Sequence, residues 1–111
     1  MGLPRAHRLT RRQDFLRLYE SGRKYVHRLA VFYVLPSETT KVGLTVSKRV
    51  GNSVQRNRVK RRLREALRRH LNEIPAIEIA VVARGGLASA PFAACEAAVT
   101  NFLCWLRPTK S

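Results

Sequence analysis

Residues 42–71 read VGLTVSKRVGNSVQRNRVKRRLREALRRHL, and this stretch decides the fold. Its first six residues place apolar side chains at positions 42, 44 and 46, which is the two-residue period of a β-strand. The Gly-Asn-Ser sequence at 51–53 ends that pattern, and the apolar residues that follow recur at helical spacing to about Leu71. The stretch therefore predicts a strand, a break and a long helix.

The predicted helix has one apolar face and one strongly basic face. The apolar face, which we expect to enter the core, consists of Val59, Leu63, Ala66, Leu67 and Leu71. The opposite face consists of Asn57, Arg61, Arg64 and Arg68, flanked by Arg58, Arg62 and Arg69. Like charges four residues apart destabilise a helix, and phosphates lying along this face would reverse that effect. The pattern therefore favours contact with a nucleic acid over an idle solvated face.

The whole chain is basic, and its composition is that of a folded protein. It has 111 residues, with 22 Lys and Arg against 7 Asp and Glu, a net charge of +15, and 45% hydrophobic residues. This length and hydrophobic content predict a single domain over residues 1–111 and exclude a disordered basic tail. The charge is segregated, because residues 48–70 hold ten of the basic residues and residues 1–28 hold eight. Such segregation is typical of a protein that binds phosphates.

Before the quoted stretch, the chain predicts a helix and then one long or two short strands. Thr10 can cap a helix that runs to about Glu20. Residues 24–35 are rich in Val, Tyr and Phe and predict one strand, or two strands broken near His27. Residues 36–40 begin with a proline and predict a turn, so the strand that opens the quoted stretch should run antiparallel to the preceding one.

After the quoted stretch, a strand is predicted at residues 77–83, followed by a final helix that Ser89 can cap. The order α-β-β(-β)-α-β-α predicts an α+β fold, a two-layer α/β sandwich around one sheet. Cys95 and Cys104 fall in the final helix, roughly 13 Å apart by helical rise and on opposite faces. They therefore predict neither a disulfide nor a metal site, and we interpret both as small buried hydrophobic residues.

Other classes of function find little support in the chain. No stretch reaches the ~20 apolar residues of a membrane span, and the N-terminus has no apolar signal-peptide core, so we expect a cytoplasmic protein. The 7 acidic residues are scattered and the 3 histidines lie in separate segments, which predicts no catalytic acid–base pair and no metal cluster. A basic helix lying on a membrane surface is one alternative, although its aliphatic face is better explained by a core.

Residues 43–65, which contain the run RNR at 56–58, closely resemble the signature of the bacterial ribonuclease P protein subunit. Residues 9–15 and 19–22 are also similar to that family, so the resemblance covers nearly the whole chain. It implies a fold like that of ribosomal protein S5 domain 2, with a left-handed β-α-β crossover through the basic helix. General topology rules favour a right-handed crossover, so the expected hand rests on the resemblance alone.

The resemblance also implies a function. Proteins of this family bind a large catalytic RNA, and the complex acts as an endoribonuclease that removes the 5′ leader of precursor tRNA. Mg²⁺ ions held mainly by the RNA would activate water, so no catalytic residue and no metal ligand is expected in this chain. The implied partners are the catalytic RNA and precursor tRNA, with no membrane and no obligate protein partner.

Two sets of residues follow from the resemblance by position. The first contacts the catalytic RNA and consists of Lys48, Arg49, Arg56, Arg58, Lys60, Arg61, Arg62 and Arg64. The basic helix face adds Asn57 and Arg68 to this set. The second lines a cleft between that helix and the sheet, which takes the single-stranded leader, and its aromatic residues are Phe15, Tyr19 and Tyr33. A ribosomal or RNA-chaperone protein with no tie to catalysis is the remaining alternative.

Overall fold

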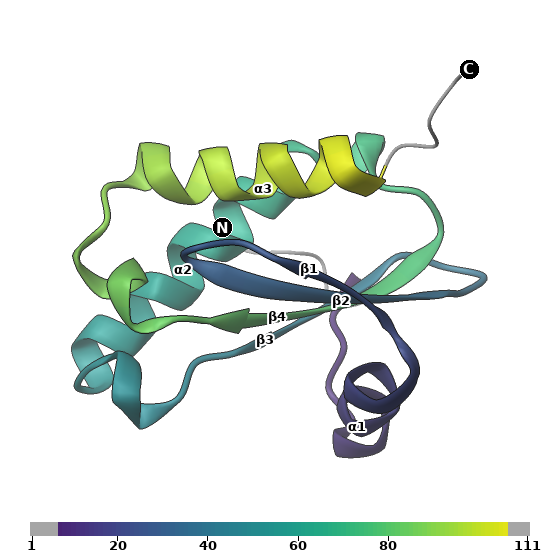
Figure 1. Ribbon diagram of the computed structural model, residues 1–111, viewed down its shortest axis with the longest axis horizontal. Helices are drawn as coiled ribbons and strands as arrows, with labels where there is room; N and C mark the ends of the chain where they lie inside the picture. The colour runs from purple at the N-terminus through teal and green to yellow at the C-terminus, as the bar shows by residue number, and fades with distance from the viewer. Residues whose placement is uncertain (1–6, 107–111) are drawn as a thin grey trace.

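The computed structural model describes residues 7–106, which form a four-stranded sheet and three α-helices (Figure 1). The helices are α1 (Arg12–Ser21), α2 (Ser53–Arg69) and α3 (Phe92–Leu106). The strands are β1 (Arg23–Val26), β2 (Ala30–Pro36), β3 (Lys41–Thr45) and β4 (Ile77–Ala83). Short 3₁₀ helices are η2 (Lys48–Val50), η3 (Leu71–Glu73) and η4 (Gly85–Ser89). The order confirms the predicted α+β class, with the segment at 24–35 divided into two strands.

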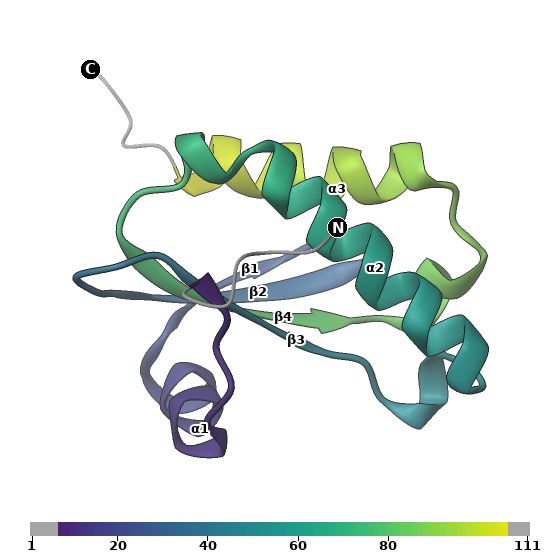
Figure 2. The same ribbon diagram turned by 180° about the vertical axis from the view of Figure 1, so that it is seen from behind.

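The sheet has the strand order β1-β2-β4-β3, so β4 lies between β2 and β3. β1 pairs with β2, and β2 with β4, in antiparallel register, whereas β3 pairs with β4 in parallel. β3 therefore runs antiparallel to β2, as expected, but is not its hydrogen-bonded neighbour. Parallel neighbours need a long connection, which α2 supplies between β3 and β4. α2 and α3 cover one face of the sheet, and α1 lies on the other (Figures 1 and 2).

The main core lies between the sheet and helices α2 and α3. Phe32 of β2 and Phe102 of α3 stack with their ring centroids 4.3 Å apart. Four of the five predicted core residues of α2 are buried there, namely Val59, Leu63, Ala66 and Leu67. Leu71 follows in η3 and is half-buried. α2 is thus held by its apolar face, and its outer face is free to carry charge.

The start of α2 depends on contacts that the sequence prediction did not use. The Asn52 side chain accepts a hydrogen bond from the Gln55 backbone N–H, and the Gln55 side chain accepts one from the Asn52 backbone N–H, both at 2.9 Å. Reciprocal capping of this kind stabilises the first turn of a helix. A side chain at Gly51 would collide with Gln55, so glycine is required at this close approach.

Two predicted helix caps are wrong. Thr10 does not cap α1, which begins at Arg12 without a side-chain cap. The residues before α1 instead pair along the edge of β3, where the Leu9 N–H donates to the Val42 carbonyl oxygen at 2.8 Å. Ser89 does not cap α3, because its hydroxyl donates to a carbonyl oxygen within η4 at 3.4 Å.

The two cysteines of α3 lie in different surroundings. Cys95 is buried and Cys104 is exposed, and both are free thiols. The absence of a disulfide between them is confirmed, but the expectation that both are buried is wrong for Cys104. Burial raises the pKa of the Cys95 thiol.

No helix within residues 7–106 combines the length and the apolar character needed to cross a bilayer. The signal-peptide prediction rests partly on residues 1–6, which lie outside the described residues.

Candidate nucleic-acid interface

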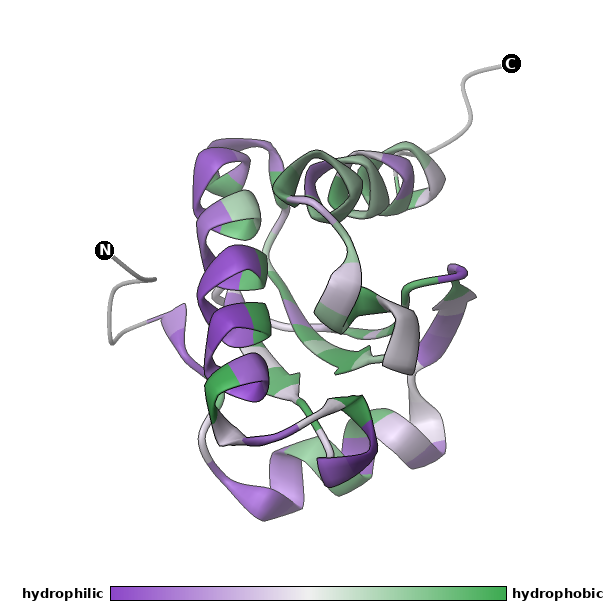
Figure 3. Ribbon diagram, turned by 90° about the vertical axis from the view of Figure 1, so that its left-hand side faces the viewer, coloured by the Kyte–Doolittle hydropathy of each residue, from purple (hydrophilic) through white to green (hydrophobic). Residues whose placement is uncertain are grey.

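The outer face of α2 and the short helix η2 before it carry positive charge that residues 7–106 do not neutralise. Figure 3 shows hydrophilic residues along the outer side of this helix and hydrophobic residues on its inner side. Among residues 7–106, seven predicted contact cations have no carboxylate within 4.0 Å, namely Lys48, Arg49, Arg56, Arg58, Lys60, Arg61 and Arg64. The predicted contact residue Asn57 is exposed among them. We call these eight residues the open basic face, and it is available to an anionic partner.

One hydrogen-bond donor of Arg56 is unsatisfied. Its Nε atom is buried and has no hydrogen-bond partner, although the residue as a whole is half-buried. A buried donor without an acceptor destabilises a protein by ~1–3 kcal/mol. A phosphate can supply the missing acceptor only if the Arg56 side chain turns outward when the phosphate binds.

Arg62 and Arg68, the other two predicted contacts, already have partners within the protein. Arg62 donates to the Ala90 carbonyl oxygen at 2.6 Å, so it links α2 to the start of α3. Arg68 donates from two nitrogens to the two Glu65 oxygens, at 3.0 and 2.5 Å. RNA contact by these two residues stays a prediction, and the structure places neither on the open basic face.

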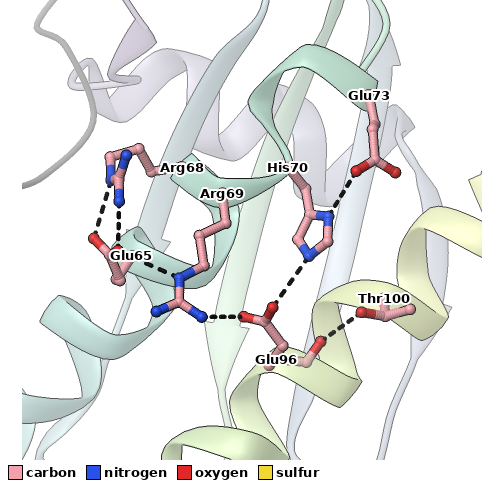
Figure 4. Close-up of polar contacts among 7 residues, drawn as sticks. All are labelled: Glu65, Arg68, Arg69, His70, Glu73, Glu96 and Thr100. Atoms are coloured by element: carbon pink, nitrogen blue, oxygen red, sulfur yellow. Dashed lines mark hydrogen bonds and ion pairs between the residues drawn. The ribbon is translucent and has the colours of Figure 1, made fainter.

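The last turn of α2 forms an acid-paired cluster with α3 (Figure 4). Arg69 contacts Glu65 at 3.4 Å and Glu96 at 3.9 Å, and its guanidinium lies over the Phe92 ring. His70 places Nδ1 2.9 Å from Glu73 and Nε2 3.4 Å from Glu96. We call this group, made up of Glu65, Arg68, Arg69, His70, Glu73 and Glu96, the acid-paired end. Hydrogen bonds from Arg68 lower the pKa of the Glu65 carboxyl to about 2, with a smaller contribution from Arg69.

The three predicted cleft aromatics lie together on the α1 face of the sheet. The Tyr19 ring is 6.3 Å from that of Phe15 and 5.0 Å from that of Tyr33. Phe15 packs against Gly43 of β3 so closely that any side chain at 43 would collide with it. All three aromatic residues are half-buried around a second core formed by Leu9, Leu18 and Ala80.

The predicted placement of these three aromatics between α2 and the sheet is therefore wrong. α2 packs on the opposite face of the sheet, so these aromatic side chains do not line a space between α2 and the sheet. The reason is that α1 carries two of them and covers the other face. Their role in binding the leader stays a prediction.

Next to these aromatics lies a row of side chains that the sequence reasoning missed. In cross-strand register, Val26 pairs with Val31, Val31 with Val82, and Val82 with Thr45. We call these four residues the valine strip. Val26 is 55% exposed and the other three are half-buried, so the strip is an incompletely covered apolar surface. The Tyr19 hydroxyl hydrogen bonds to the Thr45 hydroxyl at 2.8 Å, which joins the strip to α1.

The valine strip provides a second surface suited to RNA. Aromatic side chains on many RNA-binding sheets stack on unpaired bases, and Tyr19 and Tyr33 adjoin this strip. β3 ends at Thr45, and the cations Lys48 and Arg49 follow within four residues. Alternation in β2 and β4 indicates which residues face away from the main core, but only the strand register shows that they form one row.

Comparisons with known proteins identify the family of this chain. Residues 3–106 match the family model described as Ribonuclease P. The chain belongs to the ribonuclease P protein family. The ribonuclease P protein component of Desulforapulum autotrophicum is 45% identical over 89 residues, which cover 78% of this chain and 76% of that one. The corresponding component of Gluconacetobacter diazotrophicus is 41% identical over 95 residues, covering 81% and 82%.

Solved structures of the family have the same fold. The RNase P protein of Staphylococcus aureus superposes with a TM-score of 0.85 at 29% identity, covering 93% of this chain and 97% of that one. The Thermotoga maritima protein gives a TM-score of 0.81 at 26% identity, covering 91% and 98%. Family membership makes this chain an RNA-binding component involved in processing the tRNA 5′ leader.

Proposed function

We propose that the chain is the protein subunit of a ribonucleoprotein endoribonuclease, in which it binds a catalytic RNA and the 5′ leader of precursor tRNA. The observation that carries the proposal is the open basic face. Its seven cations have no carboxylate partner among the described residues, and the chain belongs to the ribonuclease P protein family. A face of this kind binds RNA phosphates with release of counterions. Both the catalytic RNA and precursor tRNA carry such phosphates, and we expect the protein to meet them in the cytoplasm.

The α1 face supports binding of a single strand. The ring of Tyr33 lies beside the valine strip, and Lys24 places its ammonium 6.0 Å from that ring. Unpaired bases can stack on such a ring or lie on the apolar strip, while a phosphate contacts the lysine. We therefore assign the leader to the α1 face and the catalytic RNA to the open basic face.

We assign the chemical step to the RNA. Hydrolysis of the phosphodiester would leave a 5′-phosphate on the tRNA and a 3′-hydroxyl on the leader, and Mg²⁺ held by RNA would activate the attacking water. Among residues 7–106, no three His, Cys, Asp or Glu side chains form a group that could hold a metal ion. The described side chains thus offer no ready-made metal cluster, and the role that we assign to them is binding: they reduce repulsion between two RNAs and hold the leader.

Reconstitution with the purified catalytic RNA tests the proposal. At low Mg²⁺, adding the protein should produce cleavage at the leader junction of precursor tRNA. The holoenzyme should also bind precursor tRNA more tightly than mature tRNA. A protein that binds RNA without stimulating cleavage would contradict the proposal and favour an RNA chaperone.

A pair of tyrosine variants tests the assignment of the leader to the α1 face. Tyr33→Leu should weaken holoenzyme affinity for precursor tRNA by about tenfold, since a base–aromatic stack contributes ~1–3 kcal/mol, and should leave mature tRNA affinity unchanged. Tyr25→Leu is the matched control, because Tyr25 lies on the neighbouring strand but packs in the main core against Phe102 and Trp105. Equal loss of affinity for both tRNAs would contradict the assignment.

A further inference from the structure

α1 divides the lower face of the sheet into two unlike regions. The valine strip lies on one side of the row that α1 covers. A row made by Leu35 and the charged residues Glu78 and Lys41 lies on the other. On that second side is a cavity of about 350 Å³, bounded by the segment before α1, by α1 itself and by β3 and β4. We call it the α1 cavity. Its charged lining residues are Arg8, Arg11, Asp14, Arg17, Lys41 and Glu78.

The two acids of the α1 cavity are both engaged by one guanidinium. Arg17 contacts Asp14 at 3.1 Å and Glu78 at 2.5 Å, and the bond to Glu78 raises the pKa of Arg17. Arg11 and Lys41 line the same cavity with no carboxylate within 4.0 Å among the described residues. Four cations and two acids leave a net lining charge of +2. The cavity therefore has an excess of positive charge that an anion would neutralise.

A second cavity connects this region to α2. It measures about 190 Å³, shares Arg8, Leu9 and Thr10 with the α1 cavity, and is also lined by Gly43 and by Arg64 of the open basic face. The segment between the two cavities is firmly held, because Leu9 is buried and its N–H is bonded to β3. A fixed path of positive charge thus runs from Arg64, around the outer edge of β3, to Arg11 and Lys41.

We propose that this path binds the phosphodiester backbone of RNA, with one phosphate in the α1 cavity between Arg11 and Lys41. The proposal rests on the proposed function in one respect, that the partner is RNA. Guanidinium and ammonium groups are the usual protein ligands of a phosphate oxygen. A divalent cation does not fit, because both acids are held by Arg17 and further cations surround them. This contact is separate from the valine strip, since α1 lies between them.

The test compares two double variants that remove the same charge. Arg11→Gln with Lys41→Gln alters the α1 cavity, and Arg23→Gln with Arg28→Gln is the control, since these residues lie outside both cavities. Binding is measured against salt for the catalytic RNA alone, and for the holoenzyme with precursor and with mature tRNA. The cavity variant should reduce the slope of log affinity on log salt by about 1 for each phosphate that it no longer neutralises, relative to the control. Thermal unfolding of the cavity variant should match that of the wild-type protein, whereas the control also loses the contact of the Arg23 guanidinium with the Trp105 ring, 4.7 Å away.

Each outcome decides the proposal. A reduced slope with the catalytic RNA identifies that RNA as the source of the phosphate, and a reduced slope only with the tRNAs identifies the substrate. Slopes equal to those of the control variant in all three measurements would overturn the proposal. If the phosphate binds as proposed, Lys41→Arg in place of Lys41→Gln should restore part of the slope. Wild-type protein that fails to bind the catalytic RNA would instead overturn the proposed function.

Discussion

The two ends of α2 use the same residue type in opposite ways. Its first three turns present arginines with no acid partner among the described residues, whereas the acid-paired end surrounds Arg68, Arg69 and His70 with three glutamates. Cations near a helix C-terminus are favoured by the macrodipole, and cations near the N-terminus are opposed by it. The C-terminal arginines therefore stabilise the fold, while the N-terminal ones reduce its stability until an anion binds. Arginine content alone does not identify the binding surface.

The largest expected effect comes from the open end of the helix. Arg58→Ala with Arg61→Ala should reduce the slope of log affinity for catalytic RNA on log salt by about two, because each arginine is expected to neutralise one phosphate. Arg68→Ala is the control from the other end; it removes one charge and should change the slope by far less than one. The melting temperature of the double variant should not fall, since neither arginine has an ion pair within residues 7–106. Equal effects of the control and the double variant would remove the distinction between the two ends.

Opening the acid-paired end should have the next largest effect. Glu65→Gln removes the partner of Arg68 and one partner of Arg69, and it raises the net charge by one. We expect tighter binding to the catalytic RNA and a salt slope steeper by about one, with lower thermal stability. Glu38→Gln makes the same change in charge on the exposed turn before β3 and serves as the control. If both variants bind equally, the effect belongs to net charge and not to release of Arg68.

A smaller effect is expected where α2 meets α3. Arg69→Ala removes the contact with Glu96 and the stacking over Phe92, and should lower the free energy of unfolding by about 0.5–1 kcal/mol. Arg69→Lys keeps the charge but removes the planar stack, so it should recover only part of that stability. Chemical denaturation measures both, and RNA affinity should change little. A large drop in RNA affinity would place Arg69 in the binding surface.

The pH dependence of Glu65 gives the smallest effect. Its pKa of about 2 lies below the ordinary value of 4.5, so pairing with Arg68 stabilises the fold fully above pH 4.5 and the contribution disappears as the pH falls toward 2. The pair is exposed, so the change in stability should be small and should shrink further in high salt. Carboxyl chemical shifts followed by NMR should show Glu65 titrating well below its ordinary range. A midpoint for Glu65 near 4.5 would mean that the pair does not form in solution.

Periodicity predicted the core side of α2 correctly because four of its five apolar residues meet one continuous core. It could not separate Arg68 from Arg61, because both lie on the polar side and only the position of the Glu65 carboxylate distinguishes them. The sequence also could not predict which side of the sheet α1 covers, because this depends on how the segment at 8–9 pairs with β3. The valine strip needed the register of all four strands, which local patterns do not contain.

The close packing of Phe15 on Gly43 distinguishes two proposed roles of the molecule, which are to bind the catalytic RNA and to bind the leader. A methyl group at position 43 would displace the Phe15 ring, through which α1 packs on the sheet. Position 43 lies on the face of the sheet away from α2. On the proposed assignment of the leader to the α1 face, Gly43→Ala would therefore weaken leader binding more than it weakens binding of the catalytic RNA. In a cell that makes both forms, such a subunit would compete with the normal one for the catalytic RNA, so one altered gene copy would lower leader binding in the share of holoenzyme that carries it.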